Sequence, residues 1–395
     1  MSLDNVFDKF LGNEAIFSNR SVLSIAFTPE NIPHREEQIN ELGRMLAPSL
    51  RGDKPSNIFV YGRTGTGKSL ITRLVGEQLE KRSRSNGNLV KVVYLNCKMK
   101  TADTEYRLLA SLSKEFGVDV PFTGLPTDKV YDIFFDCIDS KKQSVIIIID
   151  EIDALIQKNG DEILYNLTRM NQDLKNSRVS LIGITNDLGF IENLDPRIRS
   201  SLSEEELIFP PYNAIQLQDI LRNRSKNAFK ESSLQEGVIE KCAALAAQEH
   251  GDARRALDLL RVSAELAERT GSSKILIEHV DKAEDKIDID RTVELVKAQP
   301  KQSQAVLWGI IKLGKKGNIE TSDVIDKYHE VCQENGIKPL TQRRISDLIG
   351  ELDMFGMINT RVVSKGRYGR TKVVSMNVSE HVYNKLTTTL QQSFL

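Results

Sequence analysis

Short, almost uninterrupted apolar runs alternate with amphipathic stretches between about residues 56 and 209. A strand buried on both faces is apolar at nearly every position, whereas a half-buried strand alternates. The pattern predicts five strands: Ile58–Tyr61, Val90–Leu95, Val145–Ile149, Val179–Ile184 and Glu206–Phe209. The first four are apolar at nearly every position. Strands that alternate with helices predict a parallel α/β sheet.

The pattern changes after Pro210 and Pro211, and the chain from Asn213 to about Ile287 has the pattern of helices. The helices predicted there are Ile215–Phe229, Gln235–His250, Asp252–Arg269 and a shorter one near Ile277. Residues 287–300 are expected to form a connector. This all-α stretch predicts a helical lid on the preceding sheet domain.

The last region contains three short helical patterns followed by two β-type segments. In chain order these are Gln302–Leu313, Ser322–Glu334, Gln342–Phe355, Ile358–Val363 and Thr371–Val378. A glycine-containing hairpin tip, residues 364–370, joins the two strands. Three helices and a hairpin predict a winged helix. The expected fold class is therefore α/β, with a parallel-sheet base at 1–211, an all-α lid at 212–290 and a winged-helix domain at 300–395.

Composition fits an ordinary globular protein, with 40% hydrophobic and 28% charged residues. No apolar run approaches the ~20 residues of a membrane span, and the N-terminus lacks a basic segment followed by an apolar one, so no membrane partner and no signal peptide are expected. The four cysteines form no CxxC pair, so neither a zinc site nor a disulfide framework is indicated. We expect a reducing, intracellular location.

The net charge of −1 hides an asymmetry along the chain. Residues 300–395 contain 14 Lys and Arg against 9 Asp and Glu, a net charge of +5, so the rest of the chain carries −6. A basic C-terminal region on an acidic body indicates a polyanion-binding module.

The segment Gly62–Ser69 fits the phosphate-loop pattern G-x-x-x-x-G-K-[ST], between a predicted strand and a predicted helix. Its residues are Gly62, Arg63, Thr64, Gly65, Thr66, Gly67, Lys68 and Ser69. Glycines let the loop point its N–H groups at phosphate oxygens, and the helix N-terminus adds positive potential. Lys68 is expected to reach the β- and γ-phosphates and Ser69 to hold Mg²⁺, so ATP or ADP and Mg²⁺ are the predicted cofactors.

Acidic and amide side chains follow two other predicted strands. Val145–Ile149 leads into Asp150 and Glu151, at the edge where ligands of parallel sheets bind. We expect Asp150 to orient Mg²⁺ and Glu151 to polarise a water for attack on the γ-phosphate. Asn186 follows the next strand and either holds that water or caps the following helix.

Two arginines, Arg254 and Arg255, fall in the first turn of a predicted lid helix. That end of a helix repels cations, so an incoming anion is a reasonable compensation. The alternative is an ordinary solvated helix face.

Taken together, the motifs resemble those of AAA+ ATPases, and most closely the archaeal origin-recognition and replication-initiator family. That family is related to the eukaryotic origin recognition complex and its helicase-loading partner. The resemblance covers nearly the whole chain. Besides the nucleotide motifs, the supporting segments are IPHREEQ at 32–38, FPPY at 209–212, GDARRALD at 251–258 and the winged helix.

The resemblance implies further site residues. Asn186 corresponds to sensor 1, and Arg254 to the sensor 2 arginine that contacts the γ-phosphate. The implied adenine surroundings are Ile32, Pro33, His34, Arg35 and Tyr212. Arg197 and Arg199 are the two candidates for an arginine finger acting on a neighbour's nucleotide. Residues 104–129 resemble a DNA-contacting insertion of this family, and its tip, with Thr123 and Gly124, is either a groove contact or a plain surface loop.

The third helix of the predicted winged helix opens with Gln342-Arg343-Arg344-Ile345-Ser346. In helix-turn-helix docking, this end of the helix faces the major groove. Gln342, Arg343 and Ser346 are expected to face outward, and Arg344 to reach phosphate. The expected contacts of the wing, unless it is merely a solubilising hairpin, are Lys365, Gly366, Arg367, Tyr368, Gly369 and Arg370.

The sequence therefore predicts an ATP-regulated, slowly hydrolysing ATPase that binds duplex DNA at a replication origin. The resemblance adds recruitment or loading of the replicative helicase, partnership with other initiator copies or paralogues, and a cytoplasmic, nucleoid-associated location. Two alternatives remain: an ATP-controlled transcription regulator that binds promoters, and a clamp loader or protein-remodelling AAA+ machine whose winged helix binds protein.

Overall fold

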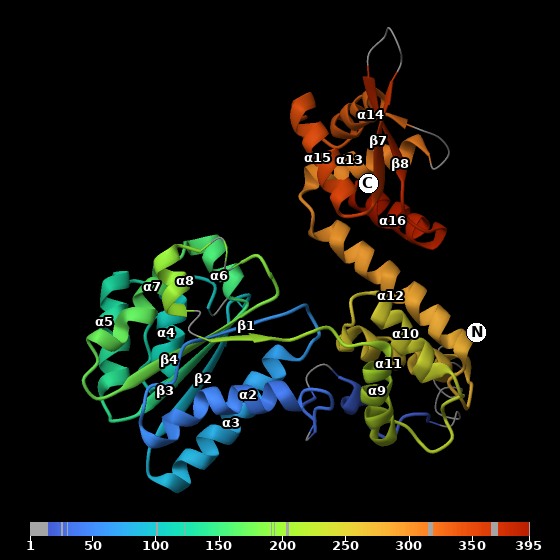
Figure 1. The fold of residues 1–395 in the computed structure, drawn as a ribbon. Coiled ribbons are helices and arrows are strands. Elements are labelled where there is room, and N and C mark those ends of the chain that lie inside the picture. The colour runs from blue at the N-terminus through green and yellow to red at the C-terminus, as the bar shows by residue number, and fades with distance from the viewer. Residues whose placement is uncertain are drawn as a thin grey trace. The chain divides into compact units, whose positions relative to one another are not determined.

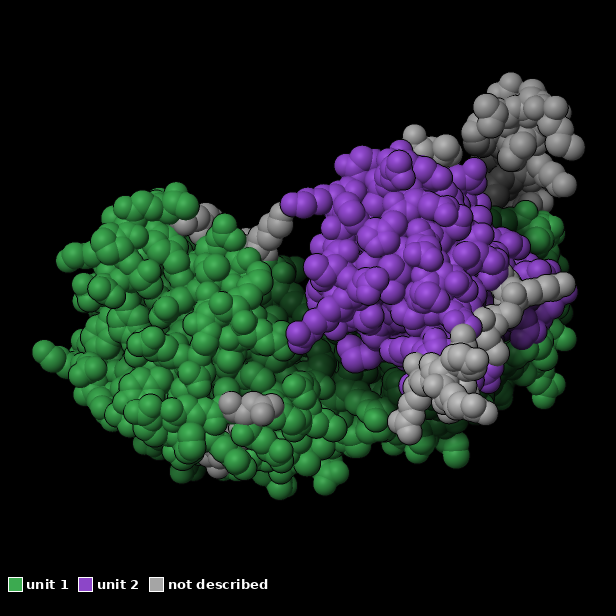
Figure 2. All heavy atoms as spheres, turned by 90° about the horizontal axis from the view of Figure 1, so that it is seen from above, with its two compact units in different colours: residues 1–277 green, residues 278–395 purple. Residues whose placement is uncertain are grey.

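The computed structural model describes residues 15–24, 27–29, 31–99, 102–121, 123–190, 192, 194–202, 205–314, 319–364 and 370–394. The chain forms two compact units, residues 1–277 and 278–395, which Figure 2 distinguishes by colour. No helix among the described residues is both long enough and apolar enough to cross a bilayer.

The first unit is built on a five-stranded parallel sheet with the strand order β2-β3-β4-β1-β5 (Figure 1). The strands are β1 (Ile58–Tyr61), β2 (Val90–Asn96), β3 (Ser144–Asp150), β4 (Arg178–Thr185) and β5 (Glu205–Ile208). All five match the predicted strands to within one residue at each end. The phosphate loop, the acids Asp150 and Glu151, and Asn186 lie at the carboxyl ends of β1, β3 and β4. These three strands are neighbours in the sheet, so their carboxyl ends lie side by side.

Helices cover both faces of this sheet. On one face are α2 (Glu36–Leu46) and α3 (Lys68–Asn86). On the other are α4 (Glu105–Glu115), α5 (Thr127–Asp139), α6 (Ile152–Asn159), α7 (Glu162–Arg169) and α8 (Pro196–Leu202). Alternate residues of β3 belong to the two cores: Ile147 to one, Ile146 and Ile148 to the other. This double coverage explains the unbroken apolar run of β3, whose seven residues are all buried.

The lid contains α9 (Ala214–Ala228), α10 (Val238–Gln248) and α11 (Ala253–Thr270), and the short helix η1 (Arg20–Leu23) packs on it. The chain near Phe17 bridges to Phe229 at the end of α9. The buried Glu268 carboxylate of α11 accepts hydrogen bonds from the backbone N–H of Ile16 and from the Arg20 side chain. The N-terminal segment is thus fixed to the lid before it reaches the base.

One sequence expectation about this region is wrong. A single helix, α12 (Ile277–Ala298), replaces both the short helix near Ile277 and the connector at 287–300. No glycine or proline interrupts the chain between Ile277 and Pro300, and Val293 and Val296 are buried in the core of the second unit. The helix is extended because its charged second half still contributes apolar residues to a core.

The second unit is a winged helix. Its elements are α13 (Lys301–Leu313), β6 (Ile319–Glu320), α14 (Thr321–Glu334), α15 (Gln342–Met354), β7 (Ile358–Ser364), β8 (Arg370–Met376) and α16 (Glu380–Ser393). The strands pair in the order β6-β8-β7. The sequence analysis did not predict α16, which buries Val382, Leu386 and Leu390 at helical spacing. The predicted fold class, an α/β base with an all-α lid and a winged helix, is confirmed.

Candidate nucleotide site and DNA-facing helix

The phosphate loop lies between β1 and α3, with Lys68 as the first residue of the helix. Lys68 is buried, and its Nζ donates hydrogen bonds to the carbonyls of Gly62 (2.7 Å) and Arg63 (2.8 Å) and to Asn186 Oδ1 (2.8 Å). Burial lowers the pKa of Lys68 to about 8, although the carboxylates of Asp150 and Glu151 act to raise it. The loop thus holds one cation against the ends of its two neighbouring strands.

The lid meets the loop at Gly65. The Ala253 N–H donates to the Gly65 carbonyl at 3.3 Å, and a Cβ at Gly65 would lie 1.6 Å from Asp252 Oδ1. The same Asp252 oxygen caps α11 through the N–H groups of Arg254 (2.7 Å) and Arg255 (3.4 Å). Only glycine fits under this cap, so the start of α11 is seated directly on the phosphate loop.

Arg254 and Arg255 differ in their surroundings. The Arg255 guanidinium is nearly buried and pairs with Glu249 at 2.9 Å. Arg254 is exposed, forms no ion pair with any described residue, and is close enough to Lys68 for its charge to act on that amine. Of the two, Arg254 is the one free to meet an anion bound at the loop.

The acids at the end of β3 each have a partner from β2 or from the residues just after it. Tyr94 Oη donates to Asp150 Oδ2 at 2.5 Å, and Lys98 Nζ lies 2.7 Å from Glu151 Oε2. Glu151 has a φ of 55°, a left-handed conformation that residues other than glycine rarely adopt. Sequence reasoning missed Tyr94 and Lys98, since neither belongs to a recognisable motif.

Asn186 connects the loop to these acids. Its Oδ1 accepts from Lys68, and its Nδ2 donates to Glu151 Oε2 at 3.0 Å. The side chain therefore points into the site, as the water-holding interpretation requires. Lys68, Glu151 and Asn186 form one continuous hydrogen-bonded group.

The buried Arg35 side chain connects three segments of the chain. It is 2% exposed, and its Nε donates to the Thr66 carbonyl at 3.0 Å while its Nη2 donates to the Pro210 carbonyl. Its guanidinium lies 3.8 Å from the centre of the Tyr212 ring, within the range of a cation–π contact. The buried guanidinium thus ties the 32–35 segment to the loop and to the start of the lid. Ile32 is buried in the core beside α2 and α3.

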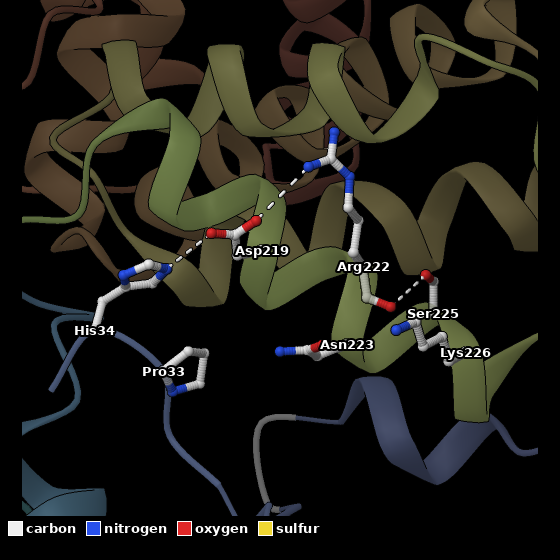
Figure 3. Close-up of a pocket in the computed structure, with 7 residues that line it drawn as sticks. All are labelled: Pro33, His34, Asp219, Arg222, Asn223, Ser225 and Lys226. Atoms are coloured by element: carbon white, nitrogen blue, oxygen red, sulfur yellow. Dashed lines mark hydrogen bonds and ion pairs between the residues drawn. The ribbon is translucent and has the colours of Figure 1, made fainter. Parts of the chain in front are cut away.

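The other two residues of that segment line a cavity of about 500 Å³ (Figure 3). Pro33 and His34 face α9, where His34 Nε2 lies 3.0 Å from Asp219 Oδ2 (Figure 3). The remaining lining residues are Arg222, Asn223, Ser225 and Lys226, all from α9. The sequence analysis did not single out any of these α9 residues.

The two arginine-finger candidates lie on α8 in different states. Arg197 forms a bidentate pair with Asp195, with distances of 3.1 Å and 2.9 Å, and this contact raises the pKa of Arg197. Arg199 is exposed and has no ion pair within the described chain. Of the two candidates, Arg199 is the one whose guanidinium has no ion pair with a described residue.

The predicted insertion, residues 104–129, contains α4 and the start of α5, and Thr123 and Gly124 are exposed between them. Two of its three basic side chains are paired with acids: Arg107 with Asp103 at 2.8 Å and Lys129 with Asp132 at 3.9 Å. Contact between this tip and DNA stays a prediction.

In the second unit, α15 buries Ile345, Leu348, Ile349 and Leu352. Gln342, Arg343 and Ser346 are exposed at its start, as the helical spacing predicted. Arg344 lies 3.4 Å from Glu351 and 3.7 Å from Asp347, acids of its own helix. Residues 365–369 of the wing lie outside the described residues, and so does the side chain of Arg370.

Three family models match this chain. They are the AAA family of ATPases associated with various cellular activities at residues 58–211, a Cdc6 AAA+ ATPase-type lid domain at 218–285, and a CDC6 C-terminal winged-helix domain at 294–385. The ORC1-type DNA replication protein 1 of Methanosarcina mazei is 53% identical over 381 residues, which cover 95% of this chain and 91% of the relative. The chain belongs to the ORC1-type DNA replication protein family.

Other members agree with this assignment. The ORC1-type DNA replication protein of Pyrococcus furiosus is 52% identical over 387 residues, covering 96% of this chain and 92% of the relative. A solved structure of the Aeropyrum pernix ORC1 protein in complex with DNA is 45% identical, with a TM-score of 0.84 over 96% of this chain and 99% of that one. The resemblance inferred from the motifs is confirmed, and the ORC1-type chain carries the AAA+ ATPase domain that the phosphate loop indicated.

Proposed function

We propose that this protein is an ATP-regulated replication initiator that binds duplex DNA at an origin. The observation that supports it most directly is the combination of two sites in one ORC1-type chain. Unit 1 holds the Lys68–Asn186–Glu151 group under a lid, and unit 2 exposes the polar start of α15. The solved structure of the 45% identical Aeropyrum pernix ORC1 protein is a complex with DNA, which supports DNA binding by this chain.

We assign roles in ATP hydrolysis to the residues of the sheet edge. The loop N–H groups and Lys68 bind the β- and γ-phosphates. Glu151 accepts a proton from the attacking water. Asn186 orients that water through its side-chain amide, which in this structure is hydrogen-bonded to both Glu151 and Lys68. Arg254 contacts the γ-phosphate from the lid. Because the lid is seated on the loop at Gly65, the state of the γ-phosphate biases the lid orientation, and slow hydrolysis acts as a switch.

The residues present fit Mg²⁺. Ser69 and Asp150 offer a hydroxyl and a carboxylate, the oxygen ligands this cation prefers, and Mg²⁺ usually takes only one or two protein ligands besides phosphates and waters. Bound there, Mg²⁺ would neutralise charge on the phosphate oxygens.

The cavity of Figure 3 supports a place for the nucleoside beside Pro33 and His34. We propose that Arg199 is the arginine finger that acts on the nucleotide of a neighbouring copy, because the Arg197 guanidinium is already paired with Asp195. We retain the division into a base at 1–211, a lid at 212–290 and a winged helix at 300–395, and recruitment of the replicative helicase, as parts of the same proposal.

The test is chromatin immunoprecipitation with sequencing in the source cells, compared with a map of replication start sites. Peaks concentrated at start sites are the expected result and would supply the recognised sequence. Peaks at many promoters away from start sites would contradict the initiator and favour a transcription regulator. An absence of discrete peaks, with DNA affinity that does not depend on salt, would favour a protein-remodelling machine.

A further inference from the structure

A single tyrosine contacts the acid that ends β3. Tyr94 lies on β2, the edge strand next to β3, and pairs in register with Ile148. Its hydroxyl donates a hydrogen bond to Asp150 Oδ2 at 2.5 Å. The phenol therefore contacts Asp150, one of the two residues that we assign to Mg²⁺.

The phenol is itself held in place. The guanidinium of Arg73, one turn into α3 from Ser69, lies 5.0 Å from the centre of the Tyr94 ring. The Asp150 carboxylate can only accept, so the Tyr94 hydroxyl is the donor of this hydrogen bond. The backbone of Asp150 is fixed as well, because its carbonyl accepts from the Cys97 N–H at 2.9 Å.

We propose that Tyr94 is a positioning residue that orients the Asp150 carboxylate for Mg²⁺. This inference rests on the proposed nucleotide site. A carboxylate at the end of a strand can rotate, and a cation that must reorder it binds more weakly. Hydrogen-bonding partners behind metal ligands commonly contribute 10- to 100-fold to metal affinity. Tyr94 orients one Asp150 oxygen, while the Glu151 N–H donates to the other at 2.9 Å.

The test compares nucleotide binding with and without Mg²⁺ in the full-length chain. Tyr94→Phe removes the hydroxyl and keeps the ring on which Arg73 lies. Tyr131→Phe is the matched control, because its hydroxyl donates to the Asn166 carbonyl at 3.3 Å, away from the phosphate loop. A fluorescent ATP analogue is titrated in EDTA, and Mg²⁺ is then titrated into the complex. Thermal unfolding without nucleotide gives the folded fraction for each variant.

The expected result is an affinity in EDTA within about twofold of the wild type for both variants. The Mg²⁺ concentration for half-maximal response should rise about tenfold in Tyr94→Phe and not in Tyr131→Phe. An unchanged Mg²⁺ midpoint in folded Tyr94→Phe, with a wild type that responds to Mg²⁺, would overturn the role of Tyr94 alone. A wild type that binds no nucleotide would overturn the proposed nucleotide site, and the role of Tyr94 with it.

Discussion

The carboxyl edge of the base sheet and the start of α15 are both polar, but they are organised in opposite ways. At the sheet edge, Lys68 is buried and has three hydrogen-bond acceptors from its own chain, and Glu151 contacts both Lys98 and Asn186. At the start of α15, Gln342 and Arg343 are exposed, and only the apolar face beneath them is fixed.

The difference follows from what each region has to do. Phosphoryl transfer requires groups that are in place before the reaction, because reorganising them adds to the barrier. A side chain that reads base edges must instead be free to meet a groove and a phosphate backbone. The proposed nucleotide site accordingly has many internal contacts, whereas the residues proposed to bind DNA are exposed.

The most severe way to break the first region is Lys68→Ala. The change removes the cation that joins the loop to Asn186, so nucleotide binding should fall below detection, while affinity for duplex DNA without nucleotide stays within about twofold. Fluorescent nucleotide titration and DNA anisotropy measure the two quantities. Retained ATP binding would remove Lys68 from its proposed role.

Glu151→Gln should separate binding from chemistry. The amide keeps the shape of the side chain but is no longer a base, so single-turnover hydrolysis should slow by roughly 10²- to 10⁴-fold at nearly unchanged ATP affinity. Asp161→Asn, an acid outside this cluster at the start of α7, serves as a control. Hydrolysis at the wild-type rate would assign the base elsewhere.

Two adjacent arginines sharpen the comparison within α15. Arg343 has no ion pair with the described residues, whereas Arg344 is near Glu351 and Asp347. Arg343→Ala should weaken binding to the recognised duplex about tenfold, in keeping with ~1–3 kcal/mol for a base contact, and Arg344→Ala should weaken it less. Competition binding at several salt concentrations gives both values. Equal losses would show that the intrahelical pairs of Arg344 do not restrain it.

The smallest effect tests whether the scaffold under α15 matters to DNA binding. Tyr328 Oη accepts from the Leu340 N–H at 3.0 Å, and Gln302 Nε2 donates to the Lys338 carbonyl at 2.9 Å, so both residues fix the loop ahead of α15. Tyr328→Phe should lower the free energy of unfolding by about 1 kcal/mol and weaken DNA binding severalfold. Tyr383→Phe, whose hydroxyl donates to the Ile311 carbonyl at 3.1 Å, should cost similar stability without the loss in DNA affinity. Equal DNA affinity of the two variants would contradict this role.

Much of the molecule could be predicted from short stretches of sequence. The phosphate loop is one of them, because its function depends on consecutive backbone N–H groups and on glycines such as Gly65, all within eight residues. The strand runs and the buried stripe of α15 are equally local, since apolar spacing follows directly from the period of a strand or helix. For α12 the prediction from local pattern was wrong: its charged second half continues as a helix, and Val293 and Val296 in it are buried in the core of the second unit.

The tertiary structure alone decided how the site is held together. Tyr94 and Asp150 are 56 positions apart and become partners because β2 lies beside β3. The family resemblance implied that Arg35 lies near the adenine. In the structure its buried guanidinium donates hydrogen bonds to the Thr66 and Pro210 carbonyls. The sequence by itself determined which residues bring chemistry to the edge of the sheet. Strand order and burial determined which of them touch, because those contacts join residues that no local pattern relates.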